Sequence, residues 1–145
     1  MANVKAGKGD PCKLVGLTVA QIQAGVIDNN TYRLPTNTEN QTFFGTSTNT
    51  NDATYSTWTA NQANEASPGT RTFLKSTPAN AVLPAAGYRS YSSGGVNNRG
   101  TRGFYWSSTP LDGTNGYMLL FYNTNVYPSN YTNYGAGNAV RCVPQ

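Results

Sequence analysis

The sequence predicts one α+β domain in which two short helices near the N-terminal end precede an antiparallel β-meander. Helix-capping residues occur at Thr18 and Thr36, and strand-like alternation of side chains begins at Gly103. With 145 residues the chain is long enough for one hydrophobic core. We therefore assign residues 1–8 to an N-terminal tail and residues 9–145 to a single domain.

The first predicted helix covers residues 18–23, because Thr18 can serve as its N-cap and Gly25 stands just beyond its end. Leu17, Ile22 and Val26 would form the buried stripe of this helix.

The second predicted helix begins at a capping box, in which Thr36 is followed three residues later by Glu39. Phe43 and Phe44 supply its apolar contacts, and Gly45 ends it.

The middle of the chain is polar and predicts a long loop over residues 49–68, held to the domain by Tyr55 and Trp58. Short strands are predicted at residues 72–75 and 81–83, with a turn at Pro78 between them.

The β-meander is predicted to contain strands at residues 104–107, 117–122, 126–127 and 139–143. Residues 112–116 and 123–125 have turn chemistry, and residues 128–137 are expected to form a loop. Alternation along residues 117–122 gives two opposite faces, made by Tyr117, Leu119 and Phe121 and by Met118, Leu120 and Tyr122. One face must be core, and the other is either buried as well or a ligand surface.

The last third of the chain is built mainly from Tyr, Asn, Ser, Thr and Gly, and eight of the ten tyrosines lie between residues 88 and 134. Tyr provides large contact area at low entropic cost, while Ser, Gly and Asn provide adaptable hydrogen bonds. This composition therefore indicates a binding surface.

The charged residues argue against several other functions. The net charge of +4 is spread thinly, apart from Arg89, Arg99 and Arg102, whereas nucleic-acid-binding proteins have denser basic clusters. The chain has no histidine, its six acidic residues are far apart, and no Cys/His cluster could bind zinc. No apolar run reaches transmembrane length. We therefore expect no catalytic residue, metal, cofactor, nucleic-acid partner or membrane span.

The two cysteines, Cys12 and Cys142, lie near opposite ends of the chain. A disulfide between them would close a loop of about 130 residues and indicate an oxidising compartment. Two separate buried thiols are the alternative, and we favour the disulfide.

Several segments, taken in order, resemble the formylglycine-generating-enzyme type of C-type-lectin fold. They are Tyr32-Arg33-Leu34-Pro35-Thr36 with Glu39-Asn40, Leu83-Pro84-Ala85-Ala86-Gly87-Tyr88-Arg89, Gly103-Phe104-Tyr105-Trp106-Ser107-Ser108-Thr109 and Val140-Arg141-Cys142-Val143. The resemblance implies a C-type-lectin-like fold, with two helices beside a small antiparallel sheet, long loops, and termini close enough for a Cys12–Cys142 bridge. Neither the calcium-site motifs of sugar-binding C-type lectins nor the enzyme's active-site cysteines are present, so neither activity is carried over.

The group that this resemblance indicates includes major paralogous surface domains of bacteria and variable proteins of diversity-generating retroelements. In the latter, adenines of a template are miscopied, and Asn codons begin with two adenines. The crowding of Asn, Tyr, Ser and Thr between residues 117 and 138 is what such diversification would leave. An AT-rich genome or an ordinary surface-protein composition would give a similar bias.

The sequence thus predicts a ligand-recognition module, an adhesin or receptor-binding domain on a cell or phage surface, whose partner is a protein or glycan on another cell or particle. The predicted contact residues are Tyr105, Met118, Leu120, Tyr122, Asn123, Asn125, Tyr127, Asn130, Tyr131, Asn133 and Tyr134. The alternative is a structural subunit of a fimbria or capsid that uses the same face to pack against a neighbour. A monomer is favoured over an oligomer.

Overall fold

The computed structural model describes residues 10–26, 31–45, 49–50, 54–60, 69–74 and 79–145. The predicted tail and the predicted turn at Pro78 lie outside these ranges, as do parts of the predicted loop at residues 49–68. The helical segments are η1 (Pro11–Leu14), α2 (Val19–Gln23) and α3 (Asn37–Phe44). The strands are β1 (Tyr32–Arg33), β2 (Asn49–Thr50), β3 (Ser56–Thr59), β4 (Thr70–Phe73), β5 (Ala81–Pro84), β6 (Tyr88–Arg89), β7 (Val96–Asn97), β8 (Arg102–Pro110), β9 (Asn115–Tyr122), β10 (Asn125–Asn133) and β11 (Val143–Pro144).

Both predicted helices form where their capping residues place them. The Thr36 hydroxyl accepts from the Glu39 amide at 3.2 Å, and Glu39 Oε2 accepts from the Thr36 amide at 2.8 Å. Thr18 caps α2 in the same way, so local chemistry sets both helix starts. The predicted buried stripe of α2 is wrong, because Ile22 and Val26 are exposed and α2 buries none of its residues.

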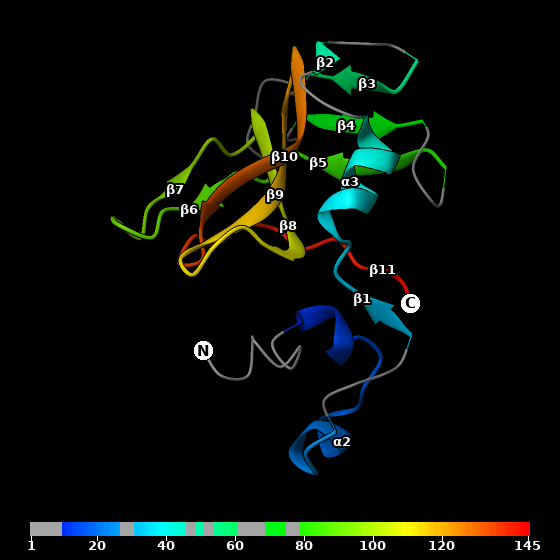
Figure 1. Ribbon diagram of the computed structural model, residues 1–145, viewed down its shortest axis with the longest axis vertical. Coiled ribbons are helices and arrows are strands. Elements are labelled where there is room, and N and C mark those ends of the chain that lie inside the picture. Colours follow the sequence, from blue (N-terminus) through cyan, green and yellow to red (C-terminus); the bar gives the residue numbers. More distant parts are fainter. Residues whose placement is uncertain (1–9, 27–30, 46–48, 51–53, 61–68, 75–78) are drawn as a thin grey trace.

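The main sheet has the strand order β2-β10-β9-β8, with all neighbours antiparallel. Helix α3 and the three-stranded sheet β3-β4-β5 lie on one side of it, and the β6–β7 hairpin lies on the other (Figure 1). The core fills the first side. There the ring of Phe73 is 4.4 Å from that of Phe44 and 5.5 Å from that of Phe121, measured between centroids.

The predicted loop at residues 128–137 is wrong in its first half, because β10 continues to Asn133. The register between β9 and β10 shifts between Tyr127 and Asn130, which places Pro128 in an irregular part of the ladder. Pro128 cannot donate a ladder hydrogen bond, and a bulge is where a strand tolerates that loss. Proline therefore marks an irregularity within this strand rather than its end.

A buried arginine connects the two larger sheets. Arg71 of β4 is fully buried, its Nε donates to Ser56 Oγ at 2.8 Å, and its Nη1 donates to the carbonyl oxygen of Tyr122 at 2.5 Å. Burial lowers the pKa of the Arg71 guanidinium. These two bonds offset the desolvation of the charge and fix β4 against the end of β9.

The N-terminal and C-terminal segments are joined in two ways. Cys12 and Cys142 form a disulfide across a sequence separation of 130 residues, and β1 pairs with β11 in antiparallel register. The prediction of a disulfide is confirmed. Such bonds are typical of oxidising compartments.

The predicted α+β class, with its C-type-lectin-like arrangement, is wrong. The structure is mostly β, and within the described residues its strands are divided among four small sheets with only α2 and α3 as α-helices. The prediction failed because residues 56–59, expected in a loop, form β3 and pair with β4, and the predicted short strands at 72–75 and 81–83 appear as β4 and β5 of the same separate sheet. In addition, α2 contributes no buried face to a helical layer.

Among the described residues, no helix combines the length and the hydropathy needed to cross a membrane.

Candidate binding cavity

The side of the main sheet that faces away from α3 carries the candidate site, and we call it the outer face. Strand register places on it, from β8, β9 and β10, Arg102, Phe104, Trp106, Met118, Leu120, Tyr122, Tyr127, Asn130 and Thr132. Phe104, Met118 and Leu120 are buried there as a second apolar cluster. The central strand is therefore buried on the inner side at Leu119 and Phe121 and also on the outer side at Met118 and Leu120.

The segment formed by residues 87–101 covers part of the outer face. Gly87 makes a parallel bridge with Gly103 of β8, and Arg89 bridges Gly137 in the stretch after β10, so this segment is held between β8 and the C-terminal stretch. The Tyr88 ring packs on that of Phe104 with centroids 4.8 Å apart. Gly87 has a φ of +72°, and a Cβ there would overlap the carbonyl oxygen of Asn97, so only glycine lets the hairpin close.

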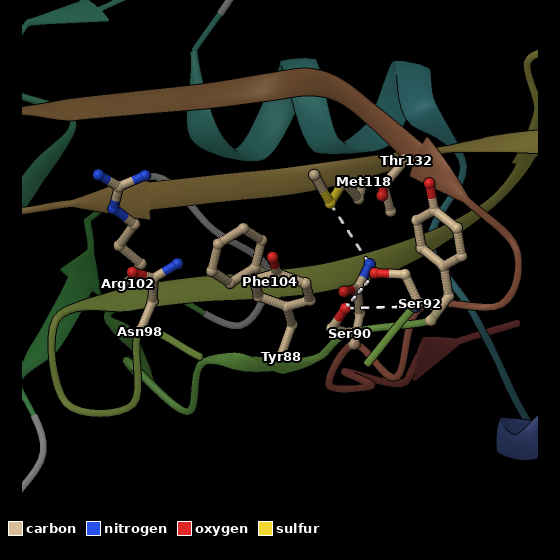
Figure 2. A pocket seen from close by; sticks show the side chains of 10 residues that line it. Tyr88, Ser90, Ser92, Asn98, Arg102, Phe104, Met118 and Thr132 are labelled. Atoms are coloured by element: carbon tan, nitrogen blue, oxygen red, sulfur yellow. Dashed lines mark hydrogen bonds between the residues drawn. The ribbon is translucent and has the colours of Figure 1, made fainter. Parts of the chain in front are cut away.

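A cavity of about 280 Å³ lies between this segment and the outer face. It is lined by Tyr88, Ser90, Tyr91, Ser92, Asn98, Arg102, Phe104, Met118, Thr132 and Asn138. Arg102 and Asn98 lie at one end, while Ser90, Ser92 and Thr132 lie at the other (Figure 2). The rings of Tyr88 and Phe104 occupy the middle (Figure 2).

The hydroxyl-rich end contains a buried acceptor without a partner. Asn138 Nδ2 donates to the Met118 sulfur at 3.4 Å, but Asn138 Oδ1 is buried and has no hydrogen-bond partner. The hydroxyls of Ser90 and Ser92 lie 3.0 Å apart and can each donate or accept. An unpaired buried carbonyl costs about 1–3 kcal/mol, so a movement of the Asn138 side chain that lets this oxygen meet a donor would be favourable.

The other end of the cavity carries a positive charge. The Arg102 guanidinium lies over the Tyr122 ring, 5.2 Å from its centroid. Within the described part of the chain, it has no hydrogen-bond or ion-pair partner. Of the described residues that line the cavity, none is acidic. The charge is therefore held in place by a ring and left available to an anion.

Two tyrosines extend the outer face beyond the cavity. The hydroxyls of Tyr122 and Tyr127 are 3.0 Å apart and their ring centroids 5.9 Å apart. The hydrogen bond to Tyr127 raises the pKa of Tyr122. Both side chains are only partly buried, so they offer a contact surface next to Arg102.

A second cavity, of about 250 Å³, adjoins the first. Tyr88 and Asn138 line both of them. The remaining lining residues of the second cavity are Ala86, Gly87, Arg89, Val96, Gly137 and Ala139.

Among the predicted contact residues, Tyr105 is too deeply buried to contact a ligand. It is 5% exposed, its ring stacks on Phe121, and its hydroxyl donates to the Pro84 carbonyl at 2.8 Å. Burial raises its pKa to about 12. Tyr105 is therefore a core residue, placed on the inner side of β8 by the same alternation that puts Phe104 outside.

The other predicted contacts fall into three groups. Met118 lines the cavity, Leu120 is buried under the outer face, and Tyr122, Tyr127 and Asn130 belong to that face. Asn123 and Asn125 lie at the turn between β9 and β10.

The third group comprises Tyr131 on the opposite side of the sheet, Asn133 in a turn, and Tyr134 beside Trp106 of the outer face. Tyr131 is 58% exposed but pairs with Tyr117 in register, which directs it to the opposite side of the sheet from Thr132. Asn133 Oδ1 accepts from the Gly135 amide at 2.8 Å and serves a turn. The ring of Tyr134 lies 6.3 Å from that of Trp106.

Most cavity residues were missed by the sequence prediction, which treated Tyr88 and Arg89 as scaffold. The missed residues are Tyr88, Ser90, Tyr91, Ser92, Asn98, Arg102, Phe104, Thr132 and Asn138. Two signals pointed towards them, the close spacing of Arg89, Arg99 and Arg102 and the glycines at positions 94, 95 and 100. Glycines at such spacing allow a hairpin to fold back over a sheet.

Comparison with known proteins gives one match. Residues 58–143 match the family described as a domain of unknown function (DUF8237). This stretch contains every residue that lines the cavity. No curated protein and no solved structure matches the chain. The resemblance drawn from the sequence therefore stays a prediction.

Proposed function

We propose that this chain, which belongs to the DUF8237 family, is a ligand-recognition module that binds through the outer face and its cavity and performs no catalysis. The observation that carries the proposal is a cavity lined by aromatic rings, hydroxyls and Arg102, in whose wall Asn138 has a buried side-chain oxygen without a hydrogen-bond partner. Buried polar groups are nearly always hydrogen-bonded, so an exception at a cavity supports a site that a ligand completes.

The chemistry of the lining supports binding rather than catalysis. It combines aromatic rings with hydroxyls, amides and one cation, the mixture found in small-molecule pockets and recognition surfaces. The described lining residues contain neither a carboxylate nor a thiol that could act as a base or nucleophile.

The disulfide supports a place outside the cytosol. We propose display on a cell or virion surface, with a protein or glycan of another cell or particle as ligand. Hypervariability is part of this proposal at the exposed turn and edge positions, such as Asn123 and Tyr134, where substitution costs little stability. A near-copy of the coding region that differs only at adenines, beside a reverse transcriptase, would support it.

The structural-subunit alternative has less support. It relied on an apolar face that a neighbouring chain would cover, but Met118 is 4% exposed and Leu120 is 9% exposed within this chain alone. Sedimentation at low concentration separates the two proposals, because a stable oligomer that protects Tyr122 and Tyr127 would favour a structural subunit.

Binding can be tested on a printed array of oligosaccharides and extracellular proteins with matched variants. We expect the wild-type chain to bind a subset of spots, and Asn138→Leu to weaken that binding at least tenfold without lowering Tm. Leucine has a similar size and removes the unpaired oxygen.

The tyrosines provide a second comparison on the same array. Tyr127→Ala should weaken binding, whereas Tyr131→Ala, on the opposite side of the sheet, should not. If Asn138→Leu and Tyr127→Ala both bind as the wild-type chain does, the outer face is not the binding site.

A further inference from the structure

We infer that the cavity takes a sugar unit that bears a carboxylate, with the carboxylate at Arg102 and the ring hydroxyls at the Ser90–Asn138 end. This inference rests on the proposed function and names the ligand class of the same site. It follows from the order in which charge, rings and hydroxyls occur along the cavity.

The cationic end specifies the carboxylate. Arg102 presents a planar fork of donors that matches a carboxylate in a bidentate pair. Its stacking over Tyr122, at 5.2 Å, restricts the side chain before any ligand arrives. Asn98 lies at the same end and adds a neutral amide (Figure 2).

The far end specifies hydroxyl groups. Ser90, Ser92 and Thr132 can each donate and accept, as can every hydroxyl of a sugar. The Asn138 side chain in the same wall has one acceptor, Oδ1, that no residue of the described structure satisfies, and a small rotation of the amide would let it accept from a ligand hydroxyl. A ligand with hydroxyls on several sides satisfies all of these groups together.

The middle of the cavity, between its two polar ends, favours a ligand that has an apolar surface at this position. The rings of Tyr88 and Phe104 lie there, and Tyr91 is 63% exposed at the rim. Carbon–hydrogen faces of a sugar ring can pack on such aromatic side chains. The volume of about 280 Å³ is at the lower limit of ordinary ligand pockets, about 300–1,000 Å³. One sugar unit therefore fits better than a stretch of polymer.

The test is an NMR titration of the full chain with glucuronic acid, galacturonic acid and N-acetylneuraminic acid, and with glucose and galactose as neutral counterparts. We expect at least one acidic sugar to shift the amide signals of residues 88–102 and to bind at least tenfold more tightly than its neutral counterpart. The preference should shrink at high salt, because a partly exposed ion pair is screened.

Variants of the arginine separate charge from position. Arg102→Gln should weaken binding of the acidic sugar about 10- to 100-fold and leave the neutral sugars unchanged. Arg102→Lys should recover only part of the affinity, because lysine lacks the fork. Arg99→Gln is the matched control for charge, since it removes an equal charge three positions away and Arg99 does not line the cavity.

Several results would overturn the inference. If neutral and acidic sugars bind equally, or Arg102→Gln has no effect, the carboxylate assignment is wrong while the recognition proposal stands. If acetate competes as well as the acidic sugars, the site binds simple anions. If none of the sugars binds, the ligand class is wrong, and the array result with Asn138→Leu decides separately whether the cavity binds anything.

Discussion

Arg33 and Glu39 form a bidentate ion pair in front of helix α3. Their atoms meet at 2.7 Å and 2.6 Å, and Glu39 Oε2 also accepts from the Thr36 amide and hydroxyl. The hydrogen bond from Arg33 is the main cause that lowers the pKa of Glu39 from 4.5 to about 2, and bonds from Thr36 add to it. The capping box was predictable because its residues are three apart, whereas the arginine partner depends on how β1 is placed.

This ion pair predicts how stability depends on acid. The folded-state pKa of Glu39 lies below its ordinary value, so the unfolded chain binds more protons at low pH. The contribution of Glu39 is therefore complete above about pH 5 and is lost as the pH falls towards 2. Urea unfolding at pH 7, 5, 3 and 2 should show a shallower loss of stability for Glu39→Gln than for the wild-type chain.

Asp112 provides a second, independent case of the same effect. Its pKa is also lowered to about 2, first by the hydrogen bond from Asn115 and then by those from Thr114. Asp112→Asn should flatten the same acid limb through an independent site. Identical acid limbs for wild type and Glu39→Gln would show that the ion pair does not stabilise the fold.

Asn138 is a cavity residue that could not be predicted from the sequence around it. Its neighbours in sequence indicate only a polar turn, and its importance arises from a buried oxygen that no residue of the described structure satisfies. Asn138 is identified by its place in the folded chain, next to Met118 of β9, and not by its residue type.

At the scale of elements, β8 and β9 approach each other closely at one glycine. A Cβ on Gly103 would overlap the ring of Phe121, which is fully buried and cannot move aside. We predict that Gly103→Ala lowers stability by about 1–3 kcal/mol through overpacking, measured by thermal unfolding. Gly113→Ala is the matched control, because no atom lies within 4 Å of its Cβ position, and it should change stability by less than about 0.5 kcal/mol. Equal effects of the two substitutions would contradict this packing argument.

Element prediction succeeded where local chemistry decides and failed where pairing decides. The capped helices and strand β9 follow from capping boxes and alternation. The extension of β10 past Pro128 depends on its partner β9 and on a bulge, which the sequence of β10 alone does not reveal. In the β3-β4-β5 sheet, strands were predicted near β4 and β5 but β3 was missed, because a polar segment of four residues gains its strand structure from pairing with β4.

At the scale of the whole molecule, the disulfide restrains nearly the entire chain. A loop of 130 residues corresponds to about 5 kcal/mol of unfolded-state entropy on the chain-entropy model. We predict that Cys12→Ser with Cys142→Ser lowers the free energy of unfolding by roughly that amount, and that a reductant does the same to the wild-type chain. Urea unfolding with and without reductant measures both effects.

The double variant also supplies the control for that experiment, because a reductant should not change its stability further. Two free thiols in the denatured, unreduced wild-type chain would contradict the bridge. The side chains of Lys13 and Gln145 meet at 2.7 Å near the same junction, so some attachment of the ends should persist after reduction.

The two residues shared by the neighbouring cavities have a consequence for the range of ligands. Tyr88 and Asn138 line both cavities, which are of nearly equal volume. A shorter residue at either position would enlarge the space open to a ligand on both sides at once, while every strand stays in place. Breadth of recognition on this face can thus change by single substitutions in a wall, without redesign of the sheet behind it.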